Sequence, residues 1–147
     1  MNLKKIDKLI CEFNSCEELL RDLGRNNYEE TFKGDVFERL TQLFLQTYPE
    51  YQTKLKNVWL GHQIPSKVLK KLNLPRDDFG IDLIAESREG SFWSVQSKYR
   101  SSRDKALTYT QLSTFFNLSF VNTNKISLAL VAHTSFKPIK NKRFLNN

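Results

Sequence analysis

Two strand-like segments joined by a tight turn constrain the fold of this 147-residue chain more than any other feature. Residues 80–87 and 91–100 alternate apolar and polar side chains, and residues 88–90 between them end in glycine. Glycine readily adopts the left-handed backbone conformation that closes a three-residue hairpin loop. The pattern therefore predicts an antiparallel hairpin in which Ser87 lies opposite Ser91.

Counting outward from this turn brings three chemically different side chains together. Asp82 lies opposite Gln96, and Lys98 lies one step further along the same face. A one-residue slip would separate these polar groups and mix the two faces, so the register is self-consistent. A carboxylate, an amide oxygen and an ammonium side by side suit the task of holding a divalent metal ion against a phosphate. The other face carries the apolar side chains Ile81, Leu83, Ala85, Trp93, Val95 and Tyr99.

Helices and two further strands are expected before and after the hairpin. Apolar residues recur at helical spacing, Ser15 and Glu18 form a capping box, and Pro49 ends a long helix. The apolar run at 126–132 is rich in branched residues and predicts a buried strand. These elements predict an α/β fold in which helices pack on both faces of a small mixed sheet. The expected helices are 3–13, 15–24, one from Thr31 or Gly34 to Tyr48, 65–72 and one that begins at Thr108, with a short strand at 58–60.

Charge and composition limit the partners and the compartment. The net charge of +7 favours an anionic partner, either nucleic acid or an acidic surface, although many basic domains bind no nucleic acid. Cys11 and Cys16 are too few for a zinc site, since no other cysteine or histidine follows at ligand spacing. Residues 1–13 are too polar for a signal peptide, and no apolar run reaches membrane-spanning length. We therefore expect a cytoplasmic protein that does not enter a membrane.

Three motifs are notable: Gly34-x-x-Phe37-Glu38 in the long helix, Asp78-x-Gly80-Ile81-Asp82-Leu83 at the start of the hairpin and Val95-Gln96-x-Lys98-Tyr99 on its second strand. They resemble those of the PD-(D/E)xK nuclease superfamily, and within it the Mrr-like restriction endonucleases, in which glutamine replaces the usual glutamate of the second motif. The resemblance extends over about residues 31–132 and implies a restriction-endonuclease-like three-layer core. It divides the chain into an N-terminal helical extension (1–30), a nuclease core (31–135) and a basic tail or linker (136–147).

The resemblance implies a Mg²⁺-dependent endonuclease that hydrolyses DNA phosphodiester bonds, with Mn²⁺ able to substitute. Asp82 and Gln96 would bind the metal together with Glu38 from the long helix. Lys98 would hold the attacking water or the scissile phosphate. These four side chains are the expected catalytic residues. Asp78 is secondary, because it can equally stabilise the turn before the strand.

Basic residues after the second strand supply the expected DNA contacts. Arg100, Arg103 and Lys105 would bind the DNA backbone, where they add affinity without reading sequence, and a charged surface loop is the simpler alternative. The resemblance also implies a larger restriction or defence system with a helicase or translocase module. Since this chain has no Gly-x4-Gly-Lys phosphate loop, such a motor would lie elsewhere. Double-strand cutting normally needs two active sites, so a homodimer is an attractive arrangement.

The glutamine of the second motif leaves the activity open. A neutral amide attracts Mg²⁺ less strongly than a carboxylate does, so the site depends more on Asp82 and Glu38. One alternative is a catalytically degenerate nucleic-acid-binding module on the same fold, which would bind DNA in a salt-sensitive way without cutting it. The other is a protein-interaction domain whose basic face docks an acidic partner, and absence of DNA binding at low salt would favour it.

Overall fold

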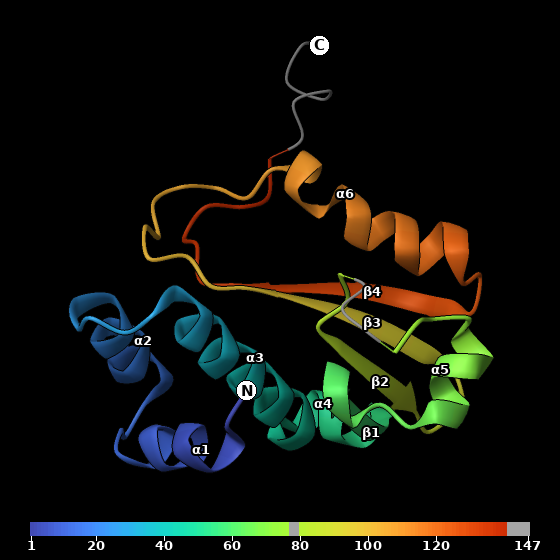
Figure 1. Ribbon diagram of the computed structural model, residues 1–147, viewed down its shortest axis with the longest axis horizontal. Helices are drawn as coiled ribbons and strands as arrows, with labels where there is room; N and C mark the ends of the chain where they lie inside the picture. The colour runs from blue at the N-terminus through green and yellow to red at the C-terminus, as the bar shows by residue number, and fades with distance from the viewer. Residues whose placement is uncertain (77–79, 141–147) are drawn as a thin grey trace.

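A four-stranded mixed sheet lies at the centre of the molecule (Figure 1). The structure is a computed structural model, and it describes residues 1–76 and 80–140. In spatial order the strands are β1 (Leu55–Leu60), β2 (Leu83–Ser87), β3 (Phe92–Lys98) and β4 (Ile126–His133). β2 pairs antiparallel with β1 and with β3, whereas β3 and β4 run parallel. A parallel pair needs a crossover connection, and the helix after β3 supplies it.

The predicted hairpin is confirmed, register included. Leu83 pairs with Val95 and Ala85 with Trp93, as the turn-based count requires. The Ser87 N–H donates to the Ser91 carbonyl at 2.8 Å, and the glycine of the turn has a φ of 84°. The strands are shorter than the sequence pattern suggested, because β2 begins at Leu83 and β3 ends at Lys98.

Helices cover both faces of the sheet, which confirms the expected α/β architecture (Figure 1). Ser15 caps the second helix by accepting a hydrogen bond from the Glu18 N–H at 3.2 Å. Pro49 ends the long helix as predicted, and it also opens a further short helix, where its missing N–H is no loss. The helices are α1 (Leu3–Cys11), α2 (Cys16–Arg25), α3 (Glu30–Thr47), α4 (Pro49–Lys54), α5 (Ser66–Leu72) and α6 (Tyr109–Asn117), with a 3₁₀ turn at Gly61–Gln63 and a π turn at Leu118–Asn122.

The sheet separates the hydrophobic core into two parts. On the α3 side the core contains Leu83, Ala85 and Val95, and on the α5 and α6 side it contains Ile84 and Phe92. Ile81 was expected on the first side but packs with the second cluster. It precedes the first ladder residue of β2, so the strict alternation of a strand does not apply to it. α1 and α2 pack against α3 through a third cluster formed by Ile6, Leu19, Leu20, Leu23, Val36 and Phe37.

The prediction that the last strand is buried is wrong. β4 is an edge strand, only Ile126 within it is buried, and Leu128 is 39% exposed. A long apolar run signals a strand with side chains packed on both faces, but it does not reveal which strand ends the sheet. Beyond β4 the chain returns along the segment before α6, since the Lys140 N–H donates to the Leu107 carbonyl at 2.8 Å. The division of the chain at residues 30 and 135 stays a prediction.

Helices of membrane-spanning length and hydrophobicity are absent from the part of the chain that the structure describes.

Candidate active site

Asp82 lies at the end of the sheet and is held there through its backbone. Its N–H donates to the Val95 carbonyl at 3.0 Å, and its carbonyl accepts a hydrogen bond from the Gly61 N–H at 2.9 Å. Gly80, two residues earlier, has a φ of 79°, a conformation that costs glycine far less than other residues. Gly80 therefore lets the chain turn towards β2 directly before Asp82, which explains why a glycine suits this position of the Gly80-Ile81-Asp82 motif.

The Asp82 carboxylate is hydrogen-bonded to residues near the end of β3. Its Oδ2 atom accepts a hydrogen bond from the Ser97 N–H at 2.6 Å and another from the Gln96 side-chain amide. Hydrogen bonds to a carboxylate are about twice as strong as those between neutral groups. The structure thus joins Asp82 and Gln96, two of the predicted site residues, directly.

Gln96 is a buried polar side chain with only 5% of its surface exposed. A buried amide needs hydrogen-bond partners, and Asp82 provides one for its nitrogen. The amide oxygen is a ligand type that Mg²⁺ accepts, as is the Asp82 carboxylate. The donor chemistry of this pair therefore fits a hard divalent cation.

Lys98 lies on the same face of β3 as Gln96. The intervening Ser97 faces α3, where its hydroxyl lies 3.4 Å from that of Thr41, and side chains alternate along a strand. In the parallel ladder Lys98 is paired with His133 of β4. Lys98 is half-buried at the end of β3, and its role beside Asp82 and Gln96 stays a prediction.

Glu38 comes from α3, which covers the opposite face of β3. It precedes Thr41 by one helical turn and is half-buried. A ligand shared by Glu38 and Gln96 would therefore have to bridge the end of the sheet, where Asp82 lies. The role of Glu38 in metal binding stays a prediction, and Asp78 lies outside the described residues.

The described residues contain no cluster of acidic or other metal-binding side chains large enough to hold a metal ion by themselves. Among residues 1–76 and 80–140, no group of three His, Cys, Asp or Glu side chains is placed to hold a metal ion. This matches the glutamine in the second motif, since an amide replaces one of the usual acidic ligands. A metal at this site would depend on Asp82, Gln96 and a further oxygen ligand such as Glu38.

The three basic residues expected to bind DNA differ in their surroundings. The Arg103 guanidinium donates to Glu17 and to the Thr134 carbonyl, each at 2.8 Å, and lies 4.0 Å from the centre of the Phe136 ring. These contacts give it a structural task that competes with a phosphate. Arg100 is half-buried and Lys105 is exposed. Their DNA contacts stay a prediction.

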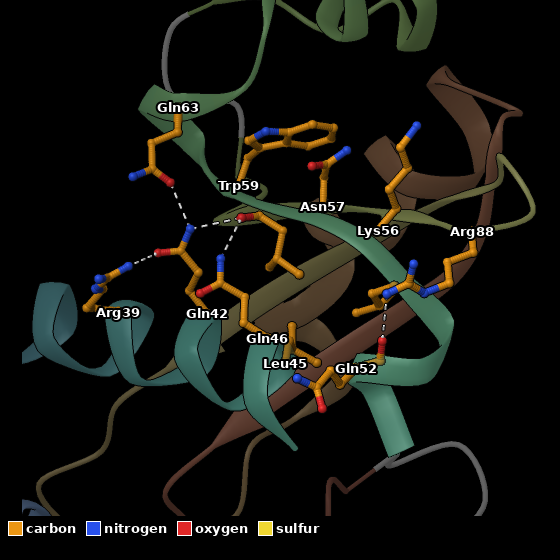
Figure 2. Close-up of a pocket in the computed structure, with 12 residues that line it drawn as sticks. Arg39, Gln42, Leu45, Gln46, Gln52, Lys56, Asn57, Trp59, Gln63 and Arg88 are labelled. Atoms are coloured by element: carbon orange, nitrogen blue, oxygen red, sulfur yellow. Dashed lines mark hydrogen bonds between the residues drawn. The ribbon is translucent and has the colours of Figure 1, made fainter. Parts of the chain in front are cut away.

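A polar groove beside β1 was not expected from the sequence (Figure 2). Its buried centre is Gln42, which lies on the sheet-facing side of α3 among apolar residues. Gln42 is one of three polar residues on the buried side of α3, with Lys33 and Thr41, and nothing in the sequence distinguished it as the centre of a groove.

Comparison with known proteins agrees with this geometry. A family model described as a restriction endonuclease, Mrr_cat_2, matches residues 46–143. The chain belongs to the restriction endonuclease family. The matched region of this family includes Asp82, Gln96 and Lys98 but begins after Glu38.

A solved restriction enzyme has the same fold as this family member. The chain is similar to the ATP-dependent Type ISP restriction-modification enzyme LlaBIII bound to DNA, with 19% sequence identity and a TM-score of 0.52. The similarity covers 92% of this chain but 8% of the chain of that enzyme. No curated protein matches the chain.

Proposed function

We infer that this restriction endonuclease domain is a Mg²⁺-dependent DNA endonuclease. The observation that carries this inference is the Asp82 carboxylate, which is fixed by the Ser97 N–H and the Gln96 amide on the strand that also carries Lys98. The carboxylate and the amide oxygen are ligand types that Mg²⁺ accepts, and Lys98 would add a positive charge on the same face of the strand. Phosphodiester hydrolysis requires both.

In this reaction the residues of the chain would bind the metal ion and orient the water and the phosphate. Asp82 and Gln96 would hold the metal ion, with Glu38 as a further ligand directly or through water. Magnesium, when bound, stabilises negative charge on the phosphate and makes a bound water more acidic. Lys98 would orient the attacking water or the scissile phosphate. In-line attack by water would leave a 5′-phosphate and a 3′-hydroxyl.

Two substitutions test the activity. Asp82→Asn removes the charge but keeps a side chain of the same shape, and Lys98→Ala removes the ammonium. Each should lower the rate of plasmid cleavage in Mg²⁺ by about 100-fold or more, the scale found when one charge-stabilising group is removed. Lys70→Ala on the exposed side of α5 is the matched control and should cleave at the normal rate. Circular dichroism checks that all variants are folded.

The cleavage assay also distinguishes the degenerate-module alternative. The Gln96 amide is neutral and bonds to Asp82 through its nitrogen, which gives that alternative a structural basis. Wild-type protein that binds DNA but cuts it in neither Mg²⁺ nor Mn²⁺ would establish the alternative. Cleavage that both variants retain at full rate would refute the proposed site.

The family and the size of the similar enzyme support a proposal for the biological setting. We place the domain in restriction or antiviral defence in the cytoplasm, as one module of a larger protein or complex that contains a helicase or translocase. Its substrate would be DNA, and a homodimer would provide the two sites that double-strand cutting normally requires.

A further inference from the structure

A groove of about 540 Å³ follows the outer edge of β1 between α3 and α4 (Figure 2). We call it the β1 groove. Its lining is rich in amide side chains and contains three cations, an indole and no carboxylate side chain. The lining residues used below are Arg39, Gln42, Lys56, Gln63 and Arg88.

Hydrogen bonds fix the buried wall of the β1 groove. Gln42 is 2% exposed, and its amide nitrogen donates to the Val58 carbonyl at 2.9 Å and to Gln63 Oε1 at 2.8 Å. Its oxygen accepts a hydrogen bond from Arg39 at 2.6 Å, and Asp7 holds the same guanidinium through both carboxylate oxygens. The wall is therefore a preformed polar surface, and the charge of Arg39 is balanced by Asp7.

The remaining cations of the β1 groove have no such balance. Lys56 and Arg88 are both exposed, and within the described residues neither forms an ion pair with a carboxylate. Arg88 is oriented over the groove by a hydrogen bond to the Gln52 carbonyl at 3.2 Å. Asp7 is bonded to Arg39 and Glu86 to Asn57, and no carboxylate side chain is among the lining residues themselves. The two unbalanced positive charges favour an anion.

The amide of Gln63 adds a donor with a defined direction. Its oxygen accepts hydrogen bonds from Gln42 and from the Leu60 N–H at 3.1 Å, so the oxygen is fixed in place. The NH₂ group is turned away from Gln42 (Figure 2). This donor suits a phosphate oxygen, which accepts hydrogen bonds and donates none.

The β1 groove adjoins the candidate active site. Gln63 follows Gly61 by two residues, and the Gly61 N–H donates to the Asp82 carbonyl. On the other wall Arg39 is the residue after Glu38. A nucleic acid strand that reached Asp82 could therefore continue along the edge of β1 without leaving the protein surface.

We propose that the β1 groove binds the phosphate backbone of the DNA that enters the active site, through Lys56, Arg88 and the Gln63 amide. This rests on the proposed function as far as DNA is the ligand. The shared chemistry is a nucleotide phosphate, which a DNA strand or a free nucleotide could supply, and the experiment separates the two sources.

The first test is the salt dependence of DNA binding. Fluorescence anisotropy with a short labelled DNA duplex in metal-free buffer measures binding without cleavage. The double variant Lys56→Gln/Arg88→Gln should bind more weakly and should reduce the slope of log K against log salt by about 2, since each neutralised phosphate contributes about 0.9. The matched control Lys67→Gln/Lys70→Gln removes the same charge from exposed positions of α5 and should leave the slope unchanged.

The second test replaces the Gln63 NH₂ donor with an acceptor and keeps the oxygen that Gln42 and the Leu60 N–H bond to. Gln63→Glu keeps an oxygen for Gln42 and the Leu60 N–H but replaces the NH₂ group with a negative oxygen. It should weaken DNA binding by about 10-fold or more, because a charged acceptor then faces the phosphate. Gln63→Met, which is uncharged and of similar length, should weaken binding less.

The outcomes separate this proposal from the proposed function. Wild-type binding that none of the groove variants changes overturns the groove proposal alone, whatever the cleavage result. Loss of cleavage in Asp82→Asn with a normal groove response leaves both proposals standing. Saturable binding of labelled ATP that Lys56→Gln/Arg88→Gln abolishes, with DNA binding intact, would identify a free-nucleotide site and overturn the backbone assignment. Wild-type protein that binds neither probe overturns the groove proposal and the DNA-binding part of the proposed function together.

Discussion

The two edges of the central sheet differ in how their backbone is covered. At the β1 edge, amide side chains occupy the outward backbone groups: Gln42 and Gln46 donate to the Val58 carbonyl, and Gln63 accepts from the Leu60 N–H. At the β4 edge, no side chain bonds to the outer backbone within the described residues. β4 instead borders an apolar groove of about 610 Å³ against α3, lined by residues that include Phe37, Leu40, Phe44, Val131 and Ala132.

Within residues 1–76 and 80–140, side chains therefore cover the backbone of one sheet edge and leave that of the other uncovered. An open strand edge is a template for pairing with another chain, and proteins commonly block it with charges or proline. β4 contains neither, whereas the glutamines beside β1 act as the block. The contrast between the two edges can be tested by removing each feature in turn.

The largest expected effect is at the closed edge. Gln42→Leu removes the donor to Val58 and Gln63 and the acceptor for Arg39, all at a nearly fully buried position. Buried polar groups that lose their partners cost about 1–3 kcal/mol each, so we expect a loss of about 2–4 kcal/mol in the free energy of unfolding. Urea denaturation measures it. Gln46→Leu is the control: Gln46 is exposed and its bond is 3.5 Å long, so it should change stability by about 0.5 kcal/mol or less. Equal losses in the two variants would show that Gln42 does not close the edge.

An intermediate effect is expected from Gln63→Ala. The Leu60 N–H loses its acceptor, and we expect a destabilisation of about 1 kcal/mol together with faster hydrogen exchange at the Leu60 amide. Gln52→Ala is the control, because the Gln52 side chain also lines the groove but makes no hydrogen bond to the strand within the described residues. Unchanged exchange at Leu60 would mean that the 3.1 Å contact does not persist in solution.

The smallest effect is expected at the other edge. Leu128→Lys places a charge on the half-open face of β4, where the leucine is 39% exposed. Thermal unfolding should show a change of about 0.5 kcal/mol or less, as for most surface substitutions. A loss above about 2 kcal/mol would show that something covers β4 in solution, and sedimentation of the same samples would then reveal whether a second copy does so.

The candidate site was predictable from the sequence in one part and not in another. The distance of Asp82 and Gln96 from the turn at 88–90 fixed their pairing, because register follows from loop length and from alternation. The position of Glu38 relative to them depends on how α3 packs across the sheet, and no local pattern specifies that. The contacts of Arg103 with Glu17 and Phe136 likewise join residues far apart in the chain.

The sequence by itself determined the hairpin, its register, most helix boundaries and the family motifs, because each depends on residues within a few positions of one another. Only the tertiary structure decided which strands form the edges, and so why β4 is half-exposed despite its apolar run. It also decided that Gln42, a buried amide of α3, caps the β1 edge and forms part of a polar groove there. The physical reason is that burial and hydrogen-bond satisfaction are settled by neighbours that are distant in sequence, whereas periodicity and turn chemistry are settled locally.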